Sequence, residues 1–188
     1  MQSDAPSVPA ILDAGRELLE RNQPSQVSMA SVAAASGYSR MAVYRHFGSR
    51  AGLLTALLAR IDEVEGAEAA VREILSAPTA EETVEKLFGW WASYVPRFAG
   101  VARGVLATKH ADTDLQAAWD ERMRNLRRVC DAVAGRCLED QRRSKVFADE
   151  LWVLVSVPLW IQLADDGWTR ERYAEVVIGL ALAGLAGG

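Results

Sequence analysis

The sequence predicts an all-α protein of about nine helices, on the strength of three observations. Apolar residues recur at helical spacing along almost the whole chain. Residues typical of helix caps and helix breaks stand between the periodic stretches, and no alternating strand pattern of useful length is found. With 188 residues, half of them hydrophobic, the chain can bury a real core. One domain, or a small domain joined to a medium one, is therefore expected.

The first half of the expected elements consists of short helices. A first helix carries the apolar stripe of Ile11, Leu12, Leu18 and Leu19 and is interrupted at Pro24-Ser25. Ser28, Ser39 and Ser49 are good N-cap residues for three further helices, MASVAAAS, RMAVYRHF and a longer one through Ile61. Gly37 and Gly48 end the first two of these.

Longer helices follow. Pro78-Thr79 precedes EETVEKLFGWWASYV, which Pro96 is expected to break before a separate helix, FAGVARGVLATK. A capping-box pattern at Thr113 opens a helix to about Leu138. Another helix is expected from Ser144 to about Ala164 with a kink at Pro158, and a last one from Thr169 through Leu185. We therefore expect a small N-terminal helical domain, residues 1–50, joined without a flexible linker to a larger C-terminal helical bundle, residues 51–188.

The segment from Ser28 to Arg50 has the layout of a helix-turn-helix motif. Two short helices are joined by a tight turn that contains glycine, and in such motifs the second helix enters the major groove of DNA. Helical spacing places Val43 and Phe47 on the inner face and Arg40, Met41, Tyr44 and Arg45 on the outer face. The net charge of −4 argues mildly against nucleic acid, but residues 1–60 carry +2, and the rest of the chain −6.

The chemistry of this outer face suits DNA. Arginines release counterions and bind guanine, Met41 offers apolar contact, and Tyr44 and His46 can donate to phosphate oxygens. Ser39 and Ser49, with Arg50, begin helices whose N-termini attract phosphate. The other interpretation is a solvated basic face with two core aromatics. The candidate DNA-binding residues are Ser28, Ser39, Arg40, Met41, Tyr44, Arg45, His46, Ser49 and Arg50.

The stretch ILDAGRELLERNQPSQVSMASVAAASGYSRMAVYRHFGSRAGLLTALL, within residues 9–60, resembles the DNA-binding domain of the tetracycline-repressor (TetR) family. The resemblance rests on ILDAxxELL, SGYS, VYRHF and GSRAGLL. It implies a homodimeric, ligand-responsive transcriptional regulator, usually a repressor, that binds a palindromic operator. It also implies base reading by Arg40 and Met41 and phosphate contacts from Ser28, Tyr44, His46 and Arg50. Met41 stands where family members often have glycine, Tyr38 where a small aliphatic residue is usual, and the N-terminal tail lacks a basic arm.

The C-terminal region resembles the family only in helix order. Its middle helices concentrate aromatic residues that are candidates for an apolar effector cavity: Trp90, Trp91, Tyr94, Phe98, Trp119 and Met123. Aromatic residues at helical spacing are also ordinary core residues, and both interpretations stay open. The expected effector is a small apolar or aromatic molecule.

The last two predicted helices are the most apolar and leave little polar surface. Packing against their copies in a second subunit would hide them, although complete burial within one chain is the alternative. The candidate interface residues are Trp152, Val155, Leu159, Val177, Leu180 and Gly184.

Other classes of protein find little support. With only His46 and His110 as histidines, no catalytic set, metal cluster or phosphate loop is evident, so we expect no enzyme, no metal and no cofactor. Cys130 and Cys137 are expected to be buried free thiols. No signal peptide is visible and VVIGLALAGLAGG is too short to span a bilayer, so we expect a cytoplasmic protein that does not enter a membrane. The arginine run from Arg122 to Arg128 is expected to face solvent. The rival function is an all-α dimeric interaction module without sequence-specific DNA binding.

Overall fold

The computed structural model describes residues 7–21 and 26–187, and within them it contains helices and no strand. The prediction of an all-α fold is confirmed. The ten α-helices of the described residues are α1 (Val8–Arg21), α2 (Met29–Ser36), α3 (Arg40–Phe47), α4 (Arg50–Val64), α5 (Ala67–Leu75), α6 (Ala80–Thr108), α7 (Thr113–Cys137), α8 (Gln141–Leu154), α9 (Val157–Asp165) and α10 (Arg170–Ala186). A short 3₁₀ segment, η2 (Lys109–Ala111), joins α6 to α7.

Two elements differ from the expectation because tertiary packing and capping decide the outcome. α6 runs through Pro96 without ending there, so the predicted break is wrong. Val95 and Phe98 on either side of the proline are buried, and this packing offsets the cost of about 3 kcal/mol of a proline inside a helix. The kink expected at Pro158 is instead a complete break two residues earlier, where the Ser156 hydroxyl accepts a hydrogen bond from the Leu159 amide. Pro158 then lies in the first turn of α9, where its missing N–H costs little.

A third difference is α5, since the sequence pattern predicts no helix between residues 65 and 78. α4 ends at Val64, and Gly66 adopts φ +69°, a left-handed conformation that favours glycine. The chain then begins a new helix, α5, with Ile74 buried at its end.

The chain forms two compact units. Unit 1 comprises the described residues up to 65 together with residues 100–123, and unit 2 comprises residues 66–99 together with residues 124–187. α6 and α7 each contribute residues to both units.

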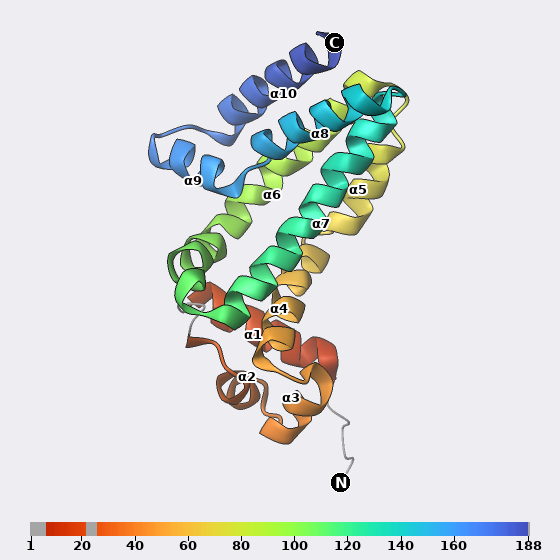
Figure 1. Ribbon diagram of the computed structural model, residues 1–188. Coiled ribbons are helices and arrows are strands. Elements are labelled where there is room, and N and C mark those ends of the chain that lie inside the picture. Colours follow the sequence, from red (N-terminus) through yellow and green to blue (C-terminus); the bar gives the residue numbers. More distant parts are fainter. Residues whose placement is uncertain (1–6, 22–25, 188) are drawn as a thin grey trace. The chain divides into compact units, whose positions relative to one another are not determined.

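In unit 1 the first four helices pack closely on one another. α1 contacts α2 and α4, α3 contacts α2 and α4 (Figure 1), and the core between them includes Ile11, Leu19, Val32 and Val43. Gly15 lets α1 approach α4, since a β-carbon there would lie 2.4 Å from a methyl carbon of Leu57. The apolar pattern of the sequence thus predicts this packing well.

In unit 2, α8 packs against α10, as Figure 1 also shows. The core of this unit is aromatic and includes Phe88, Trp91, Tyr94, Phe147 and Tyr173. The Tyr173 hydroxyl donates a hydrogen bond of 2.5 Å to the Leu154 carbonyl oxygen, at the end of α8. Burial raises the pKa of Tyr173 well above its usual value, with a smaller opposing effect from Trp91.

One stretch of the described residues, Gln141–Asp165, is long and apolar enough by composition to cross a membrane. It forms two separate helices, α8 of 14 residues and α9 of 9 residues. Because a spanning helix needs about 20 residues, neither helix is long enough to cross by itself. α8 also carries charged side chains such as Arg142, Lys145 and Glu150.

Candidate nucleic-acid interface

The first helix of the motif, α2, begins with a reciprocal cap. The Ser28 hydroxyl accepts from the Ser31 amide at 3.1 Å, and the Ser31 hydroxyl accepts from the Ser28 amide at 2.8 Å. α2 ends at Gly37, whose φ of +72° is a conformation that glycine adopts without strain. These local interactions define where α2 begins and where it ends, directly before the turn of the motif.

The second helix of the motif, α3, buries one face and exposes the other. The Ser39 hydroxyl accepts from the Ala42 amide at 3.1 Å and so caps its N-terminus. Ala42 and Val43 are buried, whereas Arg40, Met41, Tyr44, Arg45 and His46 are exposed. Met41 is 76% exposed and Tyr44 is 39% exposed. The outer face expected from helical spacing is therefore present.

Two of these exposed side chains support one another. The guanidinium carbon of Arg40 lies 5.8 Å from the ring centroid of Tyr44, at cation–π distance. Holding the arginine over the ring limits its rotamers while its N–H groups remain available. A bidentate donor presented in this way on an exposed helix face suits a guanine edge or a phosphate.

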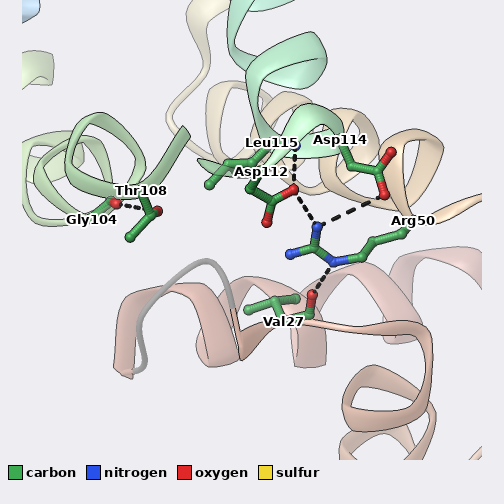
Figure 2. A network of polar contacts seen from close by, with 7 residues as sticks. All are labelled: Val27, Arg50, Gly104, Thr108, Asp112, Asp114 and Leu115. Carbon is green, nitrogen blue, oxygen red and sulfur yellow. Dashed lines mark hydrogen bonds and ion pairs between the residues drawn. The ribbon is translucent and has the colours of Figure 1, made fainter. Parts of the chain in front are cut away.

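Arg50, at the start of α4, is in a different situation. Its Nε donates to the Val27 carbonyl oxygen at 2.9 Å, and its Nη1 donates to Asp112 Oδ1 at 2.7 Å. A second carboxylate, that of Asp114, lies 3.9 Å from Nη1, and Figure 2 shows all four residues converging. Only 22% of the Arg50 side chain is exposed. Arg50 is thus engaged within unit 1, and its contact with DNA stays a prediction.

Asp112 also caps a helix. Its Oδ1 also accepts from the Leu115 amide at 3.2 Å, and so caps α7. The hydrogen bond from Arg50 is the main reason that the pKa of Asp112 lies below its usual value. Asp112 and Asp114 were absent from the sequence-based candidates because they lie more than 60 residues from Arg50. The only local signal was the position of Asp112 directly before a helix.

The arginine run on α7 does not face solvent as a whole. Arg122 is only 9% exposed, forms an ion pair with Asp62 and donates to the Leu58 carbonyl oxygen at 3.2 Å. The prediction of a solvent-facing side chain is therefore wrong for Arg122, because α4 supplies it with a carboxylate. Farther along the same helix, Arg127 forms an ion pair with Asp131 at 3.1 Å.

The candidate effector-binding residues lie in both units. Trp90, Trp91, Tyr94 and Phe98 belong to α6 in unit 2, and Trp119 and Met123 belong to α7 in unit 1. Trp90 and Tyr94 stack with ring centroids 5.0 Å apart, and Trp91, Tyr94 and Phe98 are each almost completely buried. These contacts are those of core residues. The buried indole nitrogen of Trp91 nevertheless has no hydrogen-bond partner of normal geometry.

The candidate interface residues divide by burial. Val155 and Val177 are buried inside unit 2, Trp152, Leu159 and Gly184 are half-buried, and Leu180 is 57% exposed. Three exposed valines lie on the same two packed helices, Val146 and Val153 on α8 and Val176 on α10. Between α8 and α10 a groove of about 490 Å³ is lined by residues that include Val146, Phe147 and Gly184.

Sites for other chemistry are few. Among residues 7–21 and 26–187, no group of three or more His, Cys, Asp or Glu side chains could hold a metal ion. Both cysteines are free, and Cys130 is buried as expected, whereas Cys137 is half-buried. Burial raises the pKa of Cys130 to about 12, which leaves it protonated and unreactive at neutral pH.

Comparison with known proteins places the motif in a family. Residues 11–57 match the family described as "Bacterial regulatory proteins, tetR family". This range contains most of α1, all of α2 and α3 and the first half of α4, and therefore all the candidate DNA-binding residues. No curated protein matches the chain.

Solved structures match over nearly the whole chain. A TetR-like transcriptional regulator from Rhodococcus sp. RHA1 is 18% identical, with 95% of each chain covered and a TM-score of 0.61. The multidrug binding protein EbrR, solved with imidazole, is 20% identical, with 91% of this chain and 87% of that chain covered and a TM-score of 0.64. The transcriptional regulator FadR from Bacillus subtilis, solved with stearoyl-CoA, is 17% identical, with 95% and 99% covered and a TM-score of 0.65. At these sequence identities, the comparisons show that this chain and the three proteins share a fold.

Proposed function

We propose that the chain is a ligand-responsive repressor that binds a palindromic operator as a homodimer. Its residues 11–57 match the tetR family of bacterial regulatory proteins, and its fold is that of TetR-like regulators. One observation carries this proposal: the capped helix α3 buries Val43 while it exposes Arg40, Met41 and Tyr44. A helix of an interaction module would have no need to hold an arginine over a tyrosine ring and away from the core.

In this proposal the exposed residues of α3 divide into two roles. Arg40 and Met41, in the first turn, contact base edges in the major groove. Tyr44, Arg45 and His46 contact phosphates and set the register of the helix. The hydroxyls of Ser39 and Ser49 accept hydrogen bonds from the backbone, so each retains its own O–H as a donor to phosphate. Ser28 occupies the equivalent capping position at the start of α2.

The exposed apolar side chains on α8 and α10 support the dimer. Val146, Val153, Val176 and Leu180 are exposed apolar side chains on two helices that pack side by side, and we propose that they form one apolar face. An isologous interface would pair this face with its copy, with Trp152, Leu159 and Gly184 at its edges. Val155 and Val177 support the face from beneath rather than touch the partner. A dimer places two recognition helices about one DNA turn, ~34 Å, apart.

The effector is expected to be a small apolar or aromatic molecule bound in the aromatic region of unit 2. Apart from aromatic residues and a cysteine, Thr83 is the one residue of polar type among the buried residues described, and none of them is charged. That composition favours an uncharged effector. Two proteins of the same fold were solved with small ligands, imidazole and stearoyl-CoA.

Switching requires that the effector bind the two conformations with unequal affinity. A coupling free energy of about 1–3 kcal/mol is usual for such systems. α6, which contains Pro96, supplies Trp90, Trp91, Tyr94 and Phe98 to unit 2 and continues into unit 1. We propose that a shift of the helices near Pro78 and Pro96 changes the position of α4 and hence the separation of the two recognition helices.

The DNA-binding part is tested by selecting duplexes from random sequence and measuring affinity for the selected site at several salt concentrations. We expect a palindromic site and a steep loss of affinity with salt. Arg40→Ala should weaken binding by about 1–3 kcal/mol and relax the preference at one position of each half-site. Arg72→Ala, which removes the same charge from an exposed position on α5, is the control and should leave binding unchanged.

The second candidate function is a dimeric interaction module. Weak binding without sequence preference, unaffected by Arg40→Ala, would favour it over the regulator. The regulator needs no enzyme activity and no cofactor, and we propose that it acts in the cytoplasm, where its operator lies.

A further inference from the structure

Arg50 forms ion pairs with acidic residues of its own chain, and this pairing bears on DNA binding if the chain has the function proposed above. Arg50 is the first residue of α4, directly after the Ser49 cap, at the end of the helix-turn-helix motif. Its guanidinium is a donor suited to phosphate, but two carboxylates of the α6–α7 connection already surround Nη1 (Figure 2). A carboxylate and a phosphate oxygen compete for the same donors.

The carboxylates stand on a segment that joins two helices shared by both units. Asp112 is extended, with φ −140° and ψ 99°, and it follows the 3₁₀ turn η2 at the end of α6. Asp114 lies in the first turn of α7. The Thr108 hydroxyl donates to the Gly104 carbonyl oxygen at 2.8 Å and closes the last turn of α6 just before this segment. A displacement along α6 or α7 therefore reaches Asp112 through only a few residues of chain.

The contact between Arg50 and Asp112 is only partly buried, which favours an ion pair that can open. The Arg50 and Asp112 side chains are 22% and 16% exposed, so the pair is neither fully solvated nor sealed in the core. Arg50 keeps a second attachment, from Nε to the Val27 carbonyl oxygen, which does not involve a charge. If the two carboxylates moved away, Nη1 of Arg50 could bind a phosphate oxygen instead. The hydrogen bond from Nε to Val27 would still hold the side chain on unit 1.

We propose that Asp112, assisted by Asp114, competes with the DNA backbone for Arg50 and so lowers the affinity of the protein for its operator. The position of the α6–α7 connection then sets how far Arg50 contributes to phosphate binding. Asp112 and Asp114 act through Arg50 and do not touch DNA themselves.

The test compares the wild-type chain with Asp112→Asn in binding to the selected operator and to a mixed-sequence duplex, over a range of salt concentrations. Asparagine caps a helix as well as aspartate does, so the start of α7 is retained while the charge is lost. We expect Asp112→Asn to bind both duplexes about three- to tenfold more tightly at low salt. The dependence of log K on log salt should steepen by about 0.9 per subunit.

Asp112→Ser, another good cap, should behave in the same way, and Asp114→Asn should have a smaller effect because its oxygen is farther from Nη1.

Two controls separate competition from a general charge effect. Glu63→Gln changes the net charge equally, at an exposed residue whose partner Arg60 keeps its bond to Asp13, and it should leave affinity unchanged. In an Arg50→Ala background, or in Arg50→Gln should the alanine variant fold poorly, the gain from Asp112→Asn should disappear.

The outcomes distinguish this inference from the proposed function. If the wild type selects an operator but Asp112→Asn binds no more tightly and with an unchanged salt slope, the competition is refuted and the regulator stands. If no sequence is preferred but Asp112→Asn steepens the slope on the mixed-sequence duplex, the competition stands and the regulator is refuted. Weaker binding of Asp112→Asn would show that the network positions the motif for DNA, and would overturn the competition.

Discussion

Arg122 illustrates how much a single carboxylate contributes when a guanidinium is almost completely buried. Its partner, Asp62, is 34% exposed, so the pair lies at the edge of the core of unit 1. Removing one member of such a pair leaves a charge in a poorly solvated place. We predict that Asp62→Ala lowers the free energy of unfolding by about 2–3 kcal/mol, somewhat below the range for fully buried pairs because of its partial exposure.

Denaturant unfolding followed by circular dichroism measures this change. The control is Glu68→Ala, which removes the partner of Arg72 from an exposed pair and should change the free energy by less than about 0.5 kcal/mol. Equal effects of the two substitutions would contradict the assignment of Arg122 to the core.

The Asp112 network predicts a dependence of stability on pH. The folded-state pKa of Asp112 lies below its usual value, mainly because of the hydrogen bond from Arg50. The unfolded state therefore binds the proton more readily, and the stability that Asp112 contributes is present above its ordinary pKa, about 4, and is lost as the pH falls through the folded-state value. We expect the difference in unfolding free energy between the wild type and Asp112→Asn to be constant from pH 7 to about pH 5 and to fall below that. A difference independent of pH down to pH 2 would contradict it.

At this scale the sequence predicts local interactions and misses distant ones. The caps at Ser28, Ser39 and Ser49 follow from residue type and the adjacent helical pattern, and all three hydroxyls accept a backbone amide. The partners of Arg50 and Arg122 are about 60 residues away in the chain, and only the folded structure brings the charges together.

Among the elements, the junction of α3 and α4 depends on one glycine. A β-carbon at Gly52, in the first turn of α4, would lie 2.3 Å from the carbonyl oxygen of Phe47, the last residue of α3. Backbone atoms cannot move aside as a flexible side chain can. We predict that Gly52→Ala destabilises unit 1 by about 2 kcal/mol or more, within the range of strained substitutions.

Gly135 provides the matched control. It lies in α7, is exposed, and a β-carbon there would meet no atom within 4 Å. Gly135→Ala should therefore stabilise the protein by about 0.5–1 kcal/mol, the usual gain of alanine over glycine in a helix. Thermal unfolding of both variants tests the pair, and a stabilising Gly52→Ala would show that α4 can begin elsewhere.

The elements that the sequence predicts incorrectly are those in which proline or glycine has more than one possible role. Pro158 at the start of a helix and Pro96 inside one look alike in the sequence. Both have buried residues nearby, and the difference is that Ser156 caps a new helix directly before Pro158. The helix that begins directly after Gly66 was not predicted, because it follows a left-handed glycine with no side-chain cap to mark its start. By contrast, α2 and α3 are bounded by both a serine and a glycine, and their ends are predicted correctly.

At the scale of the whole molecule, the family resemblance of the first 60 residues predicts the fold of the remainder better than the remainder's own sequence does. The TetR-like structures cover more than 90% of the chain at about 20% identity or less. Such identity preserves the helix order and little else. The exposed face of α3 could therefore be predicted from sequence, whereas an effector-binding cavity could not.

The proposed homodimer gives the last prediction, because binding to a palindromic operator would need two copies of α3. Leu180 is the most exposed large apolar side chain on α10, at 57%, and the proposed interface would bury it against a partner. Leu180→Glu would place a charge in that apolar contact without disturbing the core of unit 2. We expect sedimentation velocity to show a monomer in place of a dimer, with the wild-type helix content retained. Operator affinity should then fall at least about 100-fold, while a half-site is bound as weakly as the wild type binds it. Glu175→Gln, at an exposed position of the same helix, should leave the dimer intact, and a dimeric Leu180→Glu variant would move the interface away from α10.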